Sequence, residues 1–228
     1  MATEVKHPET PVTNEKQTID RNAAFWNKNS KYILYAFAAL VLIVGGYFAY
    51  KNYVQLPEER KASEAMFRAE EYFRMDSAQL ALNGDANNPG FLKIISRHGG
   101  TKAGNLAKFY AGASYMKLGD FKNAIKYLED FSSGDKLVSV RATGLLADAF
   151  AETGKKKEAA ETYRKAGTLY PADNFNSPEY LFRAGLLYQD LGNNKEAIEM
   201  YRTIKEKYPA SQQGRDIEKY LARLGEYN

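Results

Sequence analysis

Three segments in the second half of the chain repeat one pattern of small and aromatic residues, and a glycine follows each pattern in the same register. The glycines are Gly119, Gly154 and Gly192, which lie 35 and 38 residues apart. A period of about 34 residues is the signature of stacked helix hairpins, each of which buries its apolar face only against its neighbours. The repeat therefore predicts an all-α solenoid.

Each position of the pattern has a physical reason. A small residue lets two helices cross closely, an aromatic residue three positions later fills the space between them, and a second small residue lets the next helix return against the first. The glycine is expected to end the first helix in a left-handed conformation. In chain order these positions are Gly112, Tyr115, Gly119 and Ala124, then Ala147, Phe150, Gly154 and Ala159, then Gly185, Tyr188, Gly192 and Ala197. Pro171 and Pro209 are expected to end the second helices of their repeats.

These motifs resemble the tetratricopeptide repeat family between about Gly100 and Pro209. The resemblance implies repeats over about 105–138, 140–173 and 178–211, and a capping helix over 211–224 that gives the solenoid a solvated end. The chain departs from the family where a large aromatic residue is usual early in the first helix. Lys108, Thr143 and Leu181 stand there instead.

The segment before the repeats is predicted to complete one helical domain over residues 57–228. Pro57 and the acidic residues after it favour a helix start, and this helix is expected to run to about Asn83. Its expected apolar face consists of Ala62, Met66, Ala69, Phe73 and Leu80. Glycine and proline breakers then isolate a short helix around 91–97, and Thr101 is expected to cap the helix that follows.

Nineteen uncharged residues, from Tyr32 to Tyr50, lie between Lys31 and Lys51. A helix of that length measures about 28 Å, close to the thickness of the hydrocarbon core of a bilayer. Tyrosines gather near both ends of the segment, as amphipathic rings do at membrane interfaces. A cleaved signal peptide would have a shorter apolar region nearer the start and a small-residue cleavage site after it. We therefore predict a transmembrane helix over 32–50 that retains the chain in the membrane, preceded by a polar, disordered tail over 1–31.

Composition argues against several classes of function. The net charge is +4 and charges of both signs are interspersed, so no nucleic-acid footprint stands out. The chain has no cysteine, and its two histidines, His7 and His98, are too far apart in sequence and setting to suggest a shared metal. His98 is expected to be an exposed turn residue beside two glycines. We expect no catalytic residues, no metal, no cofactor and no small-molecule substrate, and hence a protein that is not an enzyme.

A solenoid of this kind binds proteins in the groove lined by the first helices of its repeats. Counting along those helices predicts the groove residues Phe109, Tyr110, Ala113, Met116, Arg141, Leu145, Asp148, Glu152, Glu179, Phe182, Arg183 and Leu186. The clamp that related repeats use for a C-terminal carboxylate needs basic residues and asparagine, whereas Phe109, Ala113, Leu145 and Glu179 occupy those positions. An apolar groove suits extended or helical peptide segments instead. The alternative is that Phe109 and Phe182 pack only against neighbouring helices.

A narrower resemblance concerns the layout of a short tail, one membrane helix and then repeats, together with the stretches at 88–91, 100–107 and 110–112. These features resemble membrane-anchored ancillary subunits of the Sec translocon in Bacteroidetes-type bacteria. The resemblance implies an inner-membrane protein with a cytoplasmic tail and periplasmic repeats, whose partners are translocon subunits and periplasmic chaperones. Positive charges flanking the span are equal in number on its two sides, so charge alone gives no orientation. Two alternatives stay open: a scaffold for another cell-envelope complex, in wall synthesis or outer-membrane biogenesis, and a regulatory receptor of opposite topology.

Overall fold

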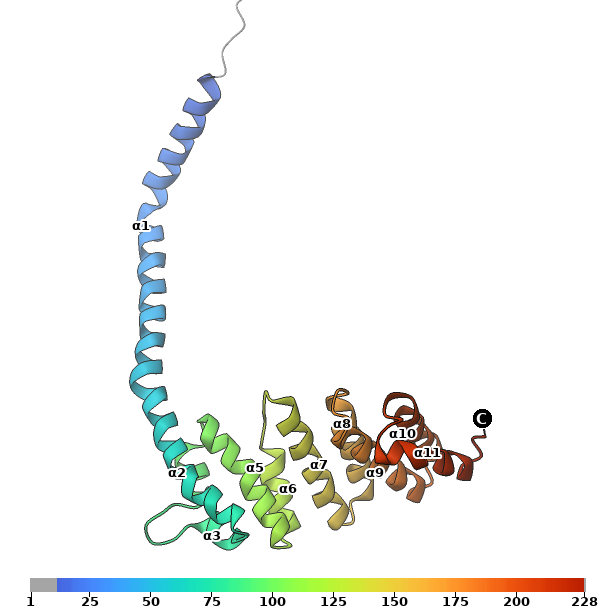
Figure 1. Ribbon diagram of the computed structural model, residues 1–228. Coiled ribbons are helices and arrows are strands. Elements are labelled where there is room, and N and C mark those ends of the chain that lie inside the picture. The colour runs from blue at the N-terminus through green and yellow to red at the C-terminus, as the bar shows by residue number, and fades with distance from the viewer. Residues whose placement is uncertain (1–11, 228) are drawn as a thin grey trace, which may run out of the picture. The chain divides into compact units, whose positions relative to one another are not determined.

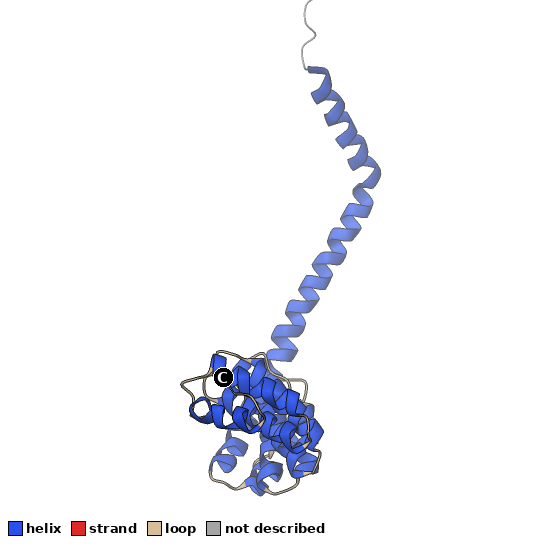
Figure 2. Cartoon of the chain, turned by 90° about the vertical axis from the view of Figure 1, so that its right-hand side faces the viewer, coloured by secondary structure: helices blue, strands red, loops and turns tan. Residues whose placement is uncertain are grey.

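The computed structural model describes residues 12–227, and every named element within that range is helical (Figure 2). The chain divides into two compact units, Met1–Pro57 and Glu58–Asn228. The predicted all-α class is confirmed.

The first unit contains α1 (Val12–Tyr50) and a short π-helical segment, η1 (Lys51–Gln55). Side chains from Tyr32 to Tyr50 are all exposed, and the helix that contains them is long and apolar enough to cross a membrane. Helix is also present from Val12 onward, where the sequence predicts a disordered tail, while residues 1–11 lie outside the described range. After Pro11 the chain has no glycine or proline until Gly45, so a helix formed by the apolar segment can extend backward at little cost.

The first part of the second unit contains α2 (Leu56–Arg74), α3 (Ala78–Asn83) and α4 (Phe91–His98). The prediction of one helix up to Asn83 is wrong, because the chain turns at Asp76, which has a φ of 59°. Lys117 Nζ lies 2.5 Å from Asp76 Oδ1, so an ion pair accompanies this left-handed turn. Beyond the turn the helix face changes, and Leu80, predicted to be apolar core, is 43% exposed. The predicted core positions of α2 before the turn are buried, namely Ala62, Met66 and Ala69.

Three helix hairpins and a final helix follow one another along the unit (Figure 1). The hairpins are α5 (Lys102–Lys117) with α6 (Phe121–Glu129), α7 (Lys136–Glu152) with α8 (Lys156–Leu169), and α9 (Asn176–Asp190) with α10 (Asn194–Lys207). Helix α11 (Gln212–Arg223) buries Ile217 and Leu221 against the last hairpin, as expected of the predicted cap. The first helices begin two to four residues before the predicted starts of the repeats.

The glycines of the repeat pattern have the predicted roles. A Cβ added to Gly112 would lie 2.5 Å from Leu128 Cγ, and one added to Gly185 would lie 2.3 Å from Tyr201 Cε1. Both helix crossings therefore require glycine. The turn glycines Gly119, Gly154 and Gly192 have φ values of 73°, 75° and 77°, in the left-handed region that ends a helix. Thr101 caps α5 as predicted, since its hydroxyl accepts a hydrogen bond from the Gly104 N–H at 2.9 Å.

Two buried clusters form the core of this unit. The first joins α2, α3, α4 and α5 around Phe91, Leu82 and Ile94, and the second extends from α6 to α11 around Tyr163, Leu181 and Tyr201. The second cluster runs continuously through successive hairpins, which is how a solenoid buries surface that one hairpin leaves exposed.

Candidate protein-binding groove

The predicted aromatic patch on α5 is part of the core. Tyr110 stacks on Phe91 with ring centroids 5.3 Å apart, and its ring also contacts Phe73 at 5.3 Å. Phe109 contacts Phe131 at 5.6 Å, and both Phe109 and Met116 pack against the second cluster. All three predicted residues are half-buried. The alternative of packing between helices therefore describes them better than an open binding surface does.

Three of the predicted polar residues come together in one network. Arg183 on α9 places Nη1 2.8 Å from Oδ1 of Asp148 on α7, and Nε 2.6 Å from Oε1 of Glu179, one turn earlier on α9. The Tyr163 hydroxyl donates a hydrogen bond to Asp148, and the Gln213 amide donates one to Glu179. The network thus ties together α7, α8, α9 and α11. Predicted positions on two successive first helices, α7 and α9, meet here.

Two members of the network, Arg183 and Tyr163, have raised pKa values. Burial lowers the pKa of Arg183, but hydrogen bonds to Tyr163 and Glu179 and the negative charge of Asp148 outweigh it and raise that pKa. Burial and the hydrogen bond to Asp148 raise the pKa of the Tyr163 hydroxyl well above its usual value of 10. Tyr163 is therefore a neutral donor, and Arg183 is a cation held between two carboxylates.

An open hollow of about 590 Å³ lies beside this network. Its walls come from α7, α9, the start of α11 and the loop before α9, and its lining includes Asp148, Phe175, Tyr180, Arg183, Gln213 and Arg215. Tyr180 reaches α7 because Gly144 leaves room for it: a Cβ there would lie 2.1 Å from Tyr180 Cζ. Phe175 in the loop is 83% exposed. We call this hollow the α7–α9–α11 groove.

A neighbouring hollow of about 390 Å³ contains the other predicted residues of α9. Phe182, Arg183 and Leu186 line it together with residues of α11. Phe182 is half-buried against Tyr220, with ring centroids 4.8 Å apart, whereas Leu186 is 40% exposed. Ala113 and Leu145 are half-buried, and Arg141 and Glu152 are exposed on α7. The structure therefore brings Asp148, Glu179 and Arg183 together, and it does not bring the α5 residues to this groove.

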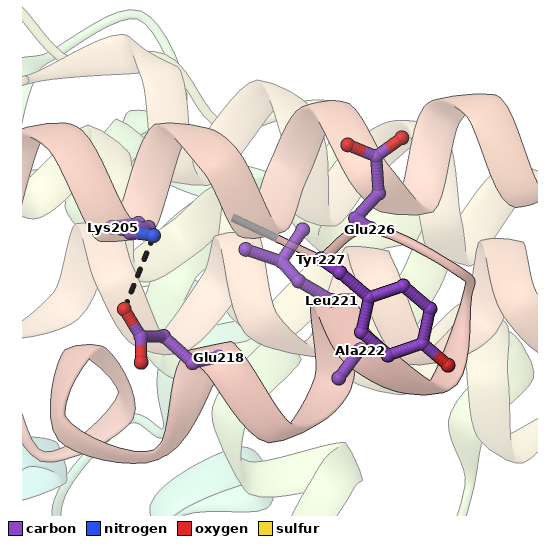
Figure 3. Close-up of a pocket in the computed structure, with 6 residues that line it drawn as sticks. All are labelled: Lys205, Glu218, Leu221, Ala222, Glu226 and Tyr227. Carbon is purple, nitrogen blue, oxygen red and sulfur yellow. Dashed lines mark ion pairs between the residues drawn. The ribbon is translucent and has the colours of Figure 1, made fainter.

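A smaller hollow lies between α10, α11 and the C-terminal residues (Figure 3). Its volume is about 170 Å³, and Leu221 at its base is buried. Lys205 Nζ lies 3.1 Å from Glu218 Oε1, and Glu226 pairs with Arg202. The charged groups around it therefore have partners within the chain, and it is a weaker candidate than the α7–α9–α11 groove.

His98 is not the exposed turn residue that the sequence predicts. Its side chain is 17% exposed, and Nδ1 lies 3.1 Å from Oε2 of Glu58 in the first turn of α2. The acidic turn of α2 and the end of α4 lie next to each other. The local sequence, a histidine beside two glycines, gives no sign of this contact. Within residues 12–227 no group of three or more His, Cys, Asp or Glu side chains is placed to hold a metal ion, and His7 lies outside that range.

Several residues of the groove are absent from the sequence prediction. Tyr163 aligns in the repeat register with Leu128 and Tyr201, so the register could have identified it as a core position of a second helix. The register does not reveal that its hydroxyl reaches Asp148. Phe175 and Gln213 belong to a loop and to the cap, outside the repeated pattern, and carry no periodic signal.

Comparison with known proteins supports the repeat class. Two tetratricopeptide repeat models match the chain, one over residues 111–174 and one over residues 179–211. The matched segments cover α6, α7, α8 and α10 in full, together with α5 from Ala111 and α9 from Glu179. No curated protein matches the chain. Residues 111–211 thus have the character of tetratricopeptide repeats, a class of modules that typically bind other proteins.

Proposed function

We propose that this protein is a membrane-tethered binding module and that the α7–α9–α11 groove receives a peptide segment of a partner protein. The observation that carries the proposal is the Asp148–Arg183–Glu179 network, which fixes polar side chains from successive repeats along the wall of one open hollow. Side chains held in this way lose little freedom when a partner binds, which favours affinity.

The lining of the groove suits recognition of a peptide. Asn174, Gln212 and other amides offer both donors and acceptors to a peptide backbone, and the exposed Phe175 ring offers apolar area. The acidic residues Asp148 and Glu179 are already paired with Arg183. These groups therefore serve to shape the wall, and a partner is more readily held by the side chains around them.

The tether is the helix that contains residues 32–50. Its exposed apolar surface has no partner within the described chain, and burial in a bilayer would remove that surface from water. We propose that the tether holds the groove close to a membrane, so that a partner in the same membrane meets it at high effective concentration.

The narrower proposal is that the partners belong to the Sec translocon and the periplasmic chaperones. It rests on the resemblance in layout and in the stretches at 88–91, 100–107 and 110–112. In this proposal the tail is cytoplasmic and the repeats are periplasmic. Assembly of another envelope complex is the alternative that the same experiment can identify.

Site-specific photo-crosslinking in native membranes tests both the groove as a binding site and the identity of the partners. A crosslinking residue at Phe175 or Arg215, within the groove, should capture specific partners, whereas one at the exposed Lys157 on α8 should not. Translocon subunits or periplasmic chaperones among the captured proteins would support the narrower proposal, and proteins of wall synthesis or outer-membrane biogenesis would support the scaffold. Equal capture from Lys157, or no capture from the groove, would overturn the assignment of the groove.

A further inference from the structure

The charged side chains around the α7–α9–α11 groove differ in whether they have partners within the chain. Asp148 accepts hydrogen bonds from Arg183 and Tyr163, and Glu179 accepts them from Arg183 and Gln213. Asp173, which is 7% exposed at the start of α9, accepts hydrogen bonds from two backbone N–H groups and from the Asn176 amide. The acidic side chains at this end of the groove therefore already have partners.

Two arginines at the same end have no such partners. Arg215 lines the groove from α11 and is exposed, and no ion pair within residues 12–227 involves it. Arg141 is exposed on α7, also without an ion pair in that range, and lies seven residues before Asp148 on the same helix face. Burial raises the pKa of Tyr180, which lines the groove, and the charge of Arg141 opposes that shift, so Arg141 lies near the groove. Among the charged side chains that line the groove, Arg215 is the one without an ion pair within the described part of the chain.

We infer that the groove binds an extended acidic segment of a partner, with carboxylates against Arg141 and Arg215 and one apolar side chain against Phe175. This inference rests on the proposed function and names the chemistry of the partner. Arginine forms bidentate hydrogen bonds with carboxylates, and because neither arginine forms an ion pair within the described residues, binding breaks none. The exposed ring of Phe175 gains by covering apolar area that now faces water.

The test uses the full chain in detergent and a fluorescein-labelled short peptide in which aspartates flank one phenylalanine. Fluorescence anisotropy should show binding that weakens as salt is added. A peptide with lysines in place of the aspartates should bind at least about tenfold more weakly, since it would meet the arginines with like charge.

The variant Arg141→Glu, Arg215→Glu should weaken binding of the aspartate peptide by at least about tenfold. The matched control Lys157→Glu, Lys219→Glu makes the same change in net charge at exposed positions outside the groove lining and should stay within about twofold. Circular dichroism melting should be unchanged for the control, and it should fall only slightly for the groove variant, in which Arg141→Glu places a negative charge near Asp173.

Failure of this inference can be distinguished from failure of the proposed function. Equal binding of the two peptides, no binding of either, or equal losses in both charge variants would overturn the acidic segment. Crosslinking of a partner from Phe175 would still support the groove in that case. Absence of crosslinks from the groove would instead contradict the proposal that the groove is a binding site.

Discussion

Tyr163 on α8 donates a hydrogen bond to Asp148 on α7, and the same carboxylate accepts another from Arg183 on α9 at 2.8 Å. One side chain therefore links two consecutive hairpins through a polar contact, in addition to the apolar core between them. In a solenoid each repeat is stabilised by its neighbours, so such a contact couples the repeats that form the groove.

Replacing Tyr163 with phenylalanine should remove the donor and keep the buried ring. Because Asp148 retains Arg183, the expected cost is about 1 kcal/mol in the free energy of unfolding. Urea titration followed by circular dichroism measures it. Tyr227→Phe, at a ring that is 81% exposed, is the matched control and should leave the midpoint unchanged. Equal midpoints for the two variants would show that the Tyr163 hydroxyl adds nothing to stability.

A fragment that begins at Pro57 should be soluble without detergent and strongly helical. The network and both buried clusters lie within Glu58–Asn228, so this unit keeps its core when the apolar segment 32–50 is removed. Circular dichroism and size-exclusion chromatography check the prediction. Recovery of the fragment only in detergent would contradict the division at Pro57.

Alanine at the two crossing glycines should destabilise the fold to different degrees. At Gly185 the added Cβ meets the fully buried Tyr201 ring at 2.3 Å, and at Gly112 it meets the Leu128 side chain at 2.5 Å. A leucine can change rotamer more easily than a packed ring can move, so Gly185→Ala should cost about 1–3 kcal/mol and Gly112→Ala less. Gly134→Ala, where nothing lies within 4 Å, is the control for urea titration. A larger loss at Gly112 than at Gly185 would contradict this ranking.

The sequence predicts the repeated core well because each of its positions depends on local packing within one hairpin. Gly112, Gly185 and the turn glycines are of that kind, and the structure confirms them. The turn at Asp76 has no glycine or proline, and Asp76 forms an ion pair with Lys117, which lies 41 residues away in sequence. A periodic pattern cannot reveal such a contact.

The groove was partly predictable for the same reason. Helical periodicity identifies Asp148, Glu179 and Arg183 as members of first-helix faces, but it does not separate open positions from those covered by the next hairpin. Phe109 shares its expected face with them and nevertheless packs against Phe131 and the second cluster. Whether the next hairpin covers a position on a first helix depends on the rotation between repeats, which is a property of the assembled solenoid.

Acid should destabilise the domain in part through Asp173. Burial raises the pKa of this carboxyl, but hydrogen bonds from the Asn176 N–H and side chain and from the Phe175 N–H outweigh it, so the pKa lies below its usual value of 3.8. A carboxyl whose pKa is lower in the folded state stabilises that state at pH values above its unfolded pKa. This stability is lost as the pH falls through the lowered value.

The variant Asp173→Asn should therefore show a smaller loss of stability between about pH 6 and about pH 3 than the unmodified chain shows. Asp173→Ala also removes the acceptor for the first N–H groups of α9, and should cost about 1 kcal/mol near neutral pH. Urea midpoints at several pH values measure both effects. Parallel pH profiles for Asp173→Asn and the unmodified chain would show that Asp173 does not contribute to acid sensitivity.

The double variant Phe109→Ala, Met116→Ala separates packing on α5 from binding in the groove. Both side chains are half-buried against the second cluster, so truncation should leave cavities and lower the free energy of unfolding by about 2 kcal/mol or more. Binding of the aspartate peptide, measured below the melting transition, should stay within about twofold, because neither residue lines the α7–α9–α11 groove. The Arg141→Glu, Arg215→Glu variant should show the opposite pattern, with little change in melting temperature and weakened binding. If the α5 variant keeps its melting temperature and loses partners that copurify from native membranes, Phe109 and Met116 belong to a binding surface on α5, and the groove is not the principal site.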